Sequence, residues 1–244
     1  MIKLVNVNKS YKDYMVLKNI DLLIQKGETL AIIGASGSGK STLLKLMIGL
    51  ERPTTGEIWI KDKEISHMDE EQLDEIRLTM GMVFQYSALF DSMTVAENVA
   101  FGLNEHSNFT EKEIEKIVDD KLELVGLKKF KHYMPNELSG GMKKRVSLAR
   151  AIAFGPEIIL YDEPSSGLDP IMAGKIDNLI KYTQKKMNVT SVVVTHDMNS
   201  AYYIADRIAM IYKGQIIALG DVKSIRESKD ERVQEFISGG RNNI

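Results

Sequence analysis

The chain has 244 residues, of which 43% are hydrophobic and 27% are charged, and its formal net charge is −2. This composition is that of a globular protein with a substantial core, and the near-neutral charge balance gives no electrostatic reason to expect a nucleic-acid partner. The absence of cysteine excludes disulfides and thiolate metal sites. No apolar run approaches the ~18 residues that cross a bilayer, and the start MIKLVNVNKSYKD lacks a signal peptide's apolar segment, so we expect any membrane role to pass through a partner.

The first sixty residues predict mostly short strands bounded by turns, at 4–7, 16–24 and 57–60. Residues 29–33, TLAII, form a continuous apolar run that ends at a glycine, which is typical of a strand buried on both faces. Further runs of this kind lie at 82–84, 158–161 and 191–195, and a hairpin is predicted around Lys213-Gly214.

Helices are predicted between these runs. Thr110 and Glu113 make a capping box for a helix that Gly126 ends, and residues 174–187 carry an apolar stripe. Strands that alternate with helices predict an α/β fold with a mainly parallel sheet, preceded by an N-terminal antiparallel β subdomain. The stretch 86–155 predicts helices and no buried strand. We therefore expect a single domain over 1–244, with a core at about 1–85 and 156–244 and an inserted helical subdomain at about 86–155.

Residues 34–41, GASGSGKS, fit the phosphate-binding pattern G-x-x-x-x-G-K-[ST] between a predicted strand and a predicted helix. Glycines let the backbone N–H groups turn toward phosphate oxygens, and the positive end of the following helix adds to the attraction. Lys40 is expected to reach the β- and γ-phosphates, and Ser41 to offer its hydroxyl to Mg²⁺. An ordinary glycine-rich turn is the alternative, but such turns rarely end in Gly-Lys-Ser after a buried strand.

Two consecutive acids end the buried strand of IILYDEP, at residues 158–164. Because successive strand residues point to opposite sides, we expect Asp162 and Glu163 to have different roles. Asp162 suits a contact to Mg²⁺, and Glu163 suits orienting or deprotonating a water in line with the γ-phosphate. Acids that merely meet solvent at a strand end are the alternative, which the phosphate-binding loop in the same sheet disfavours.

Two further polar residues follow predicted strands. His196 comes after SVVVT and is expected to donate a hydrogen bond to the γ-phosphate; Gln85 ends MVFQ and is expected to touch both the metal and the water. Ligands of open α/β sheets bind at this carboxyl edge of the strands. Each residue is a weak signal alone, since a single histidine is more often structural, but four polar strand ends at one edge indicate a site.

The stretch LSGGMKKR, residues 138–145, predicts a second anion site, because Ser139, Gly140 and Gly141 precede a helix. The alternative is an N-cap serine with flexible glycines, which this segment alone would favour. Two phosphate-binding turns in one chain allow two arrangements: one chain binds two phosphate groups, or two copies face each other with each ATP held between unlike loops. The second arrangement needs only a two-fold axis between the two copies. Because the γ-phosphate would be bound by both copies, its loss would release them from each other.

In the order of its motifs, the chain resembles the nucleotide-binding subunits of ABC transporters over nearly its whole length. The motifs are Walker A GASGSGKST, the Q-loop Gln85, the signature LSGGM, Walker B IILYDE, the D-loop SGLD at 166–169 and the switch His196. The resemblance implies an ATPase that binds ATP and Mg²⁺ as a homodimer, with the signature turn of one subunit on the other's γ-phosphate. It also implies that Asp169 links the two sites and that Tyr11 stacks on adenine, with Tyr14 as the alternative. The implied nucleotide contacts are Tyr11, Gly34, Ala35, Ser36, Gly37, Ser38, Gly39, Lys40, Ser41, Thr42, Ser139, Gly140, Gly141 and Asp169; the implied metal contacts are Ser41, Gln85 and Asp162.

Met142 stands where most members of this family have glutamine. With the stretches at 84–106 and 149–170, it resembles the branch that powers Mla/Mce-type lipid transport, although an apolar side chain packed inward is a sufficient alternative. The resemblance implies an MlaE-like membrane permease and an MCE-domain lipid-binding protein as partners, at the cytoplasmic face of the bacterial inner membrane. The helical insertion, above all residues 85–98, is expected to contact the permease.

Three alternatives stay open at this point. A polar amino-acid or methionine importer would keep every catalytic residue and differ in partner. A soluble ABC-class ATPase would usually carry long coiled arms or two tandem cassettes, which this sequence lacks. A scaffold that binds nucleotide without hydrolysing it is disfavoured by Glu163 and His196.

Overall fold

The computed structural model describes residues 2–239, which fold into two compact units. Within the described residues, the first unit covers 2–77 and 190–239, and the second comprises Leu78–Val189. The predicted helical insertion at 86–155 lies inside the second unit; its exact boundaries stay a prediction. Of the tail SGGRNNI, which the sequence leaves as a disordered end or a dimer contact, residues 240–244 lie outside the described part.

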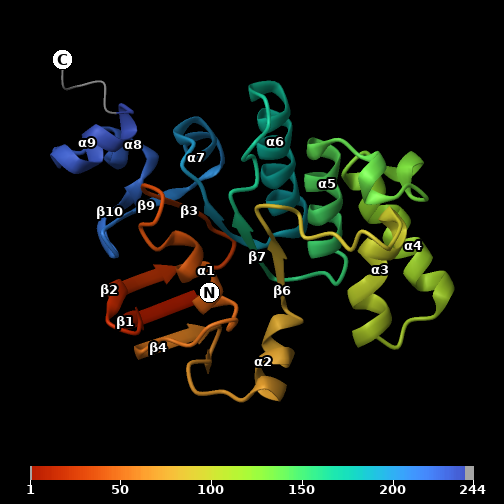
Figure 1. Cartoon of the computed structure of the whole chain (residues 1–244), viewed down its shortest axis with the longest axis horizontal. Helices are drawn as coiled ribbons and strands as arrows, with labels where there is room; N and C mark the ends of the chain where they lie inside the picture. Colours follow the sequence, from red (N-terminus) through yellow and green to blue (C-terminus); the bar gives the residue numbers. More distant parts are fainter. Residues whose placement is uncertain (1, 240–244) are drawn as a thin grey trace. The chain divides into compact units, whose positions relative to one another are not determined.

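An antiparallel sheet opens the first unit (Figure 1). It is formed by β1 (Ile2–Tyr11), β2 (Tyr14–Ile24), β4 (Thr55–Ile60) and β5 (Lys63–Glu64), in the order β2-β1-β4-β5. Ile20 and Ile24 of β2 are fully buried while their neighbours in the strand reach the surface, so one face of the sheet covers a core. This confirms the predicted N-terminal antiparallel β subdomain.

A mainly parallel group of strands forms the rest of the sheet structure of this unit. β3 (Thr29–Ile33) pairs in parallel with both β8 (Thr190–Val194) and β9 (Arg207–Tyr212). All five residues of β3 are buried, as its continuous apolar run predicts. β9 and β10 (Gln215–Asp221) form the predicted hairpin, with positive φ angles of 48° at Lys213 and 79° at Gly214.

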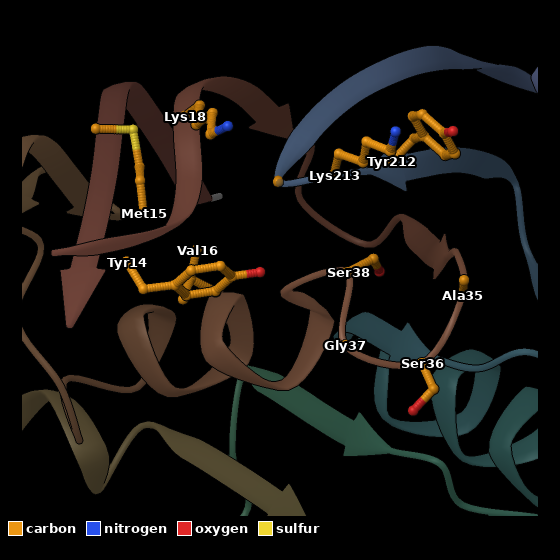
Figure 2. A pocket seen from close by; sticks show the side chains of 11 residues that line it. Tyr14, Met15, Val16, Lys18, Ala35, Ser36, Gly37, Ser38, Tyr212 and Lys213 are labelled. Atoms are coloured by element: carbon orange, nitrogen blue, oxygen red, sulfur yellow. The ribbon is translucent and has the colours of Figure 1, made fainter.

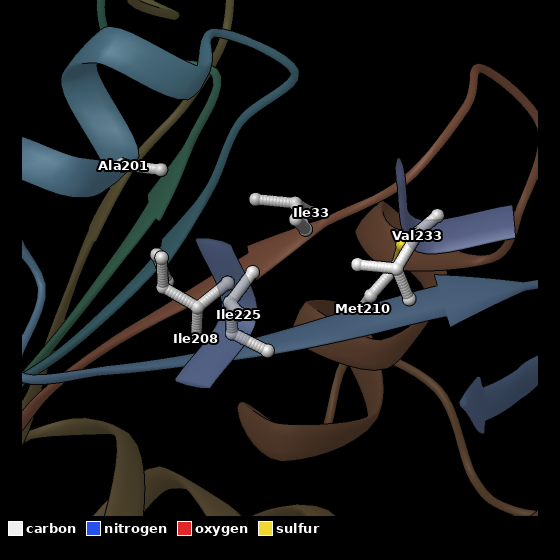
Figure 3. Packing of buried hydrophobic residues seen from close by; sticks show 7 residues of the cluster. Ile33, Ala201, Ile208, Met210, Ile225 and Val233 are labelled. Carbon is white, nitrogen blue, oxygen red and sulfur yellow. The ribbon is translucent and has the colours of Figure 1, made fainter. Parts of the chain in front are cut away.

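The helices of the first unit are α1 (Lys40–Met47), α2 (Glu70–Arg77), α7 (Met198–Ile204), α8 (Val222–Arg226) and α9 (Glu231–Ile237). The last three enclose one apolar cluster against β3 and β9. Figure 3 shows the side chains of this cluster, which consists of Ala31, Ile33, Ala201, Ile208, Met210, Ile225 and Val233. The C-terminal helices are therefore joined to the sheet that carries the phosphate-binding loop.

The second unit contains two parallel strands, β6 (Met80–Val83) and β7 (Ile158–Asp162). Its helices are α3 (Val95–His106), α4 (Glu111–Leu124), α5 (Gly140–Ala151) and α6 (Pro170–Met187), with single 3₁₀ turns at Lys128–Phe130 and Pro135–Glu137. Helices α3, α4 and α5 pack on one another, and residues 86–155 carry no strand. The predicted α/β fold class is confirmed.

Local capping signals place the helix ends. Thr110 and Glu113 form the predicted capping box of α4, and Gly126, with φ of 69°, follows its end. Helix α6 begins at Pro170, four residues before the predicted 174, because Asp169 caps it and proline suits the first helical position. Among residues 2–239, no helix combines the length and apolar character that a transmembrane span requires.

Candidate active site

The loop between β3 and α1 is shaped by close backbone approaches. A Cβ atom added to Gly34, whose φ is 149°, would lie 2.3 Å from the carbonyl oxygen of Ile211. At Gly39, with φ of 107°, it would lie 2.7 Å from Cδ2 of Leu17. Both the φ angles and the available space require glycine at these two positions. The loop can therefore fold back on the start of α1 as a phosphate-binding turn does.

Lys40 places its ammonium group inside this turn. Its Nζ donates hydrogen bonds to the carbonyl oxygens of Gly34 at 2.8 Å and Ala35 at 3.0 Å, and only 7% of the residue is exposed. Ser38 is also buried, and in the described part of the chain its hydroxyl has no hydrogen-bond partner. A buried cation and an unsatisfied hydroxyl are suited to an anion with several acceptor oxygens. The turn fits a polyphosphate.

A pocket of about 480 Å³ lies beside the turn. Figure 2 shows Ser36 and Ser38 of the turn on one side, Tyr14 and Val16 of β2 on another, and Lys213 of the β9–β10 hairpin at the edge. The remaining lining residues are Met15, Lys18, Ala35, Gly37, Tyr212 and Gly214. An aromatic ring and apolar side chains next to a phosphate-binding turn are suited to the remainder of a nucleotide.

The two candidate aromatic residues have different surroundings. The hydroxyl of Tyr11 donates to the carboxylate of Glu51 and also contacts Thr42 of the Walker A segment, and Lys9 Nζ lies 4.8 Å from its ring centroid. Burial raises the pKa of Glu51, but hydrogen bonds from Tyr11 and Lys9 outweigh this and hold the pKa below its usual value. Tyr14 is 70% exposed and lines the pocket. Tyr11 is thus held against the Walker A segment, and Tyr14 faces the pocket.

In the second unit, the two acids of the Walker B segment do not both belong to the strand, so their side chains do not follow its alternation between the two faces of the sheet. Asp162 is the last residue of β7, whereas Glu163 lies beyond the strand in the left-handed region, with φ of 49°. The expectation that the two acids alternate as strand neighbours is therefore wrong in its geometry, because the chain turns at Glu163. Their assignment to different roles stays a prediction.

Gln85 lies close to this turn. In the parallel pair β6–β7, Val83 is level with Tyr161, and Gln85 and Glu163 each follow two residues later. Lys144 of α5 is 6% exposed, and its Nζ donates to the carbonyl oxygen of Gln85 and, at 3.3 Å, to that of Glu163. The only sequence signal of this lysine is the basic run after the two glycines.

The signature turn has the geometry of a helix start. The hydroxyl of Ser139 accepts a hydrogen bond from the backbone N–H of Met142 at 3.3 Å and caps α5, which is the simpler of the two interpretations. A Cβ atom added to Gly141 would lie 2.6 Å from Cε of Met172, so the D-loop side of α6 covers this glycine closely. The N-cap role leaves the other backbone N–H groups of the first turn of α5 free of intrahelical partners.

Asp169 and His196 also lie at helix starts. One carboxylate oxygen of Asp169 accepts hydrogen bonds from the backbone N–H groups of Ile171 and Met172, both at 3.0 Å. His196 is exposed and directly precedes Asp197, which caps α7. Within residues 2–239, no three histidine or acidic side chains gather as a metal site by themselves.

The expected residues are divided between the two units. The first unit carries Tyr11, residues 34–42 and His196, and the second carries Gln85, the signature turn, Asp162, Glu163 and Asp169. Within the first unit Tyr11 contacts Thr42, and within the second Lys144 contacts Gln85 and Glu163 while Met172 covers Gly141. Three residues that sequence reasoning missed also contact them, namely Glu51, Lys144 and Met172.

Comparison with known proteins identifies relatives over nearly the full chain. The chain is 42% identical to the intermembrane phospholipid transport system ATP-binding protein MlaF of Haemophilus influenzae, over 98% of this chain and 90% of that protein. It is 41% identical to the methionine import ATP-binding protein MetN of Clostridioides difficile, over 92% of this chain and 70% of that protein.

Among solved structures, the ATP-binding cassette MJ0796 in a dimeric post-hydrolysis state bound to ADP and Pi superposes with a TM-score of 0.85. The two sequences are 37% identical, and the matched region covers 91% of this chain and 99% of the MJ0796 chain. The sequence model of the ABC transporter family matches residues 17–166, from β2 through the Walker B segment. The chain therefore belongs to the ABC transporter family, as one of its ATP-hydrolysing cassettes.

Proposed function

We propose that this cassette hydrolyses ATP to drive a permease that moves phospholipid or a related lipid in the bacterial envelope. The observation that carries the lipid assignment is the similarity to MlaF, 42% identity over 98% of the chain, together with Met142 in the signature turn. The permease would be MlaE-like and would work with an MCE-domain lipid-binding protein. The cassette would then lie at the cytoplasmic face of the inner membrane through the permease.

In the proposed reaction, the Walker A turn binds the triphosphate. The backbone N–H groups of residues 34–39 and the ammonium of Lys40 stabilise the negative charge on the β- and γ-phosphates, and the hydroxyl of Ser38 finds an acceptor there. Ser41, Gln85 and Asp162 would hold Mg²⁺, which neutralises part of the charge on the phosphate oxygens when bound. Their oxygen atoms are the hard ligands that this ion prefers.

Glu163 is proposed to orient and deprotonate the attacking water, and His196 to donate a hydrogen bond to the γ-phosphate. The role proposed for Glu163 is supported by its position just beyond the end of β7, in a left-handed turn with φ of 49°. Positioning and electrostatic stabilisation provide most of the catalysis in phosphoryl transfer. No covalent enzyme intermediate is needed.

A homodimer would complete the site. Ser139 caps α5 and Gly140 and Gly141 begin it, where backbone N–H groups have no intrahelical partners, and we propose that these three residues contact the γ-phosphate of the ATP bound to a second copy. Asp169 would link the two sites. The proposal is supported by the dimeric state of the related MJ0796 cassette. ATP shared between two chains would hold them together, and hydrolysis would weaken the contact.

The 41% identity to MetN supports methionine import as the second candidate. The two candidates share their catalytic residues and differ in what the permease carries. We expect the complex isolated with its native membrane partners to contain bound phospholipid by mass spectrometry, and its ATPase rate to be insensitive to methionine. A complex that carries no lipid and is stimulated by methionine would contradict the lipid assignment.

A further inference from the structure

A buried lysine joins the two residues proposed to handle the metal and the water. Lys144 lies in the second turn of α5, and only 6% of it is exposed. Its Nζ donates hydrogen bonds to the backbone carbonyl oxygens of Gln85 and Glu163, the latter at 3.3 Å. All three residues belong to the second unit. The contact therefore connects the signature helix to both the Q-loop and the Walker B turn.

The surrounding backbone explains why such a contact is needed. Gln85 lies just beyond β6 and Glu163 just beyond β7. At these positions the hydrogen bonds between the two parallel strands have ended and no longer hold the two segments together. Glu163 has φ of 49°, a conformation that costs a non-glycine residue on the order of 1 kcal/mol or more. An outside contact to its carbonyl oxygen therefore limits which conformations of this turn are populated.

The chemistry of the side chain also points to a role beyond filling space. Burial lowers the pKa of Lys144, whereas the carboxylates of Glu163 and Asp162 act to raise it. The ammonium therefore interacts electrostatically with both acids of the Walker B turn. A buried ammonium is a costly way to occupy this volume, since an apolar side chain would pack there without loss of hydration. A group with three donors can serve two carbonyl oxygens at once.

We propose that Lys144 is a positioning residue for ATP hydrolysis, which holds the backbones of Gln85 and Glu163 at a set separation so that their side chains meet the metal and the water together. The proposal rests on the proposed roles of these two residues. In this proposal Lys144 acts on the reaction through these two residues, since its observed hydrogen bonds go to their backbone carbonyl oxygens. Because it is part of the helix that begins with the signature turn, it also ties this turn to the catalytic pair.

The first test compares Lys144→Met with Lys144→Arg in the full chain, using Lys116→Met on the exposed face of α4 as a matched control for charge removal. We expect Lys144→Met to lower kcat at least tenfold while KM for ATP changes less than threefold. Lys144→Arg, which keeps charge and donors, is expected to restore kcat to within threefold of the parent. A kcat for Lys144→Met within twofold of the parent would overturn the proposal.

The second test is a double-mutant cycle with Glu163→Gln. If Lys144 acts by positioning Glu163, Lys144→Met should lower the residual turnover of Glu163→Gln by less than twofold; a further loss equal to that in the parent would show an independent effect and refute the proposal. Should Lys144→Met fail to fold, judged by its near-ultraviolet circular dichroism, Lys144→Gln against Lys144→Arg replaces it, and equal kcat values refute the proposal. If Glu163→Gln alone leaves turnover unchanged, the role proposed for Glu163 is wrong, whatever Lys144 does.

Discussion

Arg150 of helix α5 binds the backbone of Ala88, with its Nη1 2.6 Å from the carbonyl oxygen. Its Nη2 donates to the preceding carbonyl, that of Ser87, at 2.9 Å. Both loop residues have positive φ angles, 63° at Ser87 and 46° at Ala88, although neither is glycine. The guanidinium therefore holds a strained segment that begins two residues after Gln85. Burial lowers the pKa of Arg150.

This contact predicts a loss of stability when the donors are removed. Arg150→Met should lower the free energy of unfolding by about 1–3 kcal/mol, because it leaves carbonyl groups of a partly buried loop without donors. Urea unfolding of the full chain measures this, with an unchanged m-value. Lys112→Met on exposed α4 is the control and should have little effect. A loss below about 0.5 kcal/mol, the range of ordinary surface substitutions, would contradict the prediction.

Lys40→Ala should abolish nucleotide-dependent activity. The variant loses the ammonium that lies in the phosphate-binding turn, and we expect turnover to fall by at least about a hundredfold. Steady-state phosphate release measures the effect. Ser38→Ala removes only the unsatisfied hydroxyl and should have a smaller effect on turnover. Unchanged turnover in Lys40→Ala would remove the assignment of this turn to the triphosphate.

Glu163→Gln should keep ATP binding while it slows hydrolysis, because the amide can no longer deprotonate the water. We therefore expect a stable dimer in ATP and Mg²⁺, detected by light scattering after gel filtration. The parent protein with ADP is the control and should stay monomeric. If the variant is monomeric in ATP and Mg²⁺, and stays so within the assembled transporter, the shared-nucleotide arrangement is wrong.

The aromatic partner of adenine can be identified by alanine substitution. Loss of a base–aromatic stack costs about 1–3 kcal/mol, which corresponds to roughly five- to 150-fold in Kd for ATP. If Tyr11 is the partner, Tyr11→Ala shows this loss and Tyr14→Ala does not. Tyr11→Phe keeps the ring and removes the hydrogen bond to Glu51, so it should bind ATP nearly as well as the parent. The reverse pattern would assign the stack to Tyr14, which lines the pocket.

The capping box of α4 predicts a pH-dependent stability. Hydrogen bonds from the backbone N–H and hydroxyl of Thr110 hold the pKa of Glu113 below its ordinary value of 4.5. A carboxyl group whose pKa is lower in the folded state stabilises that state above the unfolded pKa, and this contribution is lost as pH falls through the folded pKa. Glu113→Gln should therefore be less stable than the parent at pH 7, and the difference should vanish in acid. Urea unfolding across this pH range measures it; a difference that is the same at every pH would contradict the prediction.

Patterns that depend only on neighbouring residues could be predicted from the sequence. The five buried residues of β3, the capping box at Thr110 and the hairpin at Lys213-Gly214 are found as predicted. Each arises from local physics, namely apolar periodicity, side-chain capping or a turn that needs positive φ angles. Helix α6 starts four residues before the apolar stripe at 174, because its first turn is set by the cap at Asp169 and by Pro170 and not by apolar periodicity.

The contacts of long side chains could not be predicted in this way. The sequence shows Lys144 only as part of a basic run after the two glycines, whereas the structure buries it against the backbones of Gln85 and Glu163. The distance along the chain from Lys144 to Gln85 is 59 residues, and nothing in the local sequence indicates that they meet. A lysine side chain is flexible, so where its ammonium lies depends on which polar groups the fold brings within reach.

The sequence by itself determined the chemistry of this protein, because a phosphate-binding turn, paired acids after a buried strand and a second glycine turn are each written in a few adjacent residues. Only the tertiary structure decided how these parts are held: Tyr11 against Glu51, the left-handed turn at Glu163, and the lysine that joins it to Gln85. The reason is physical. Local conformational preference acts over a few residues, whereas the burial of a charge and the satisfaction of a distant carbonyl depend on the packed chain as a whole.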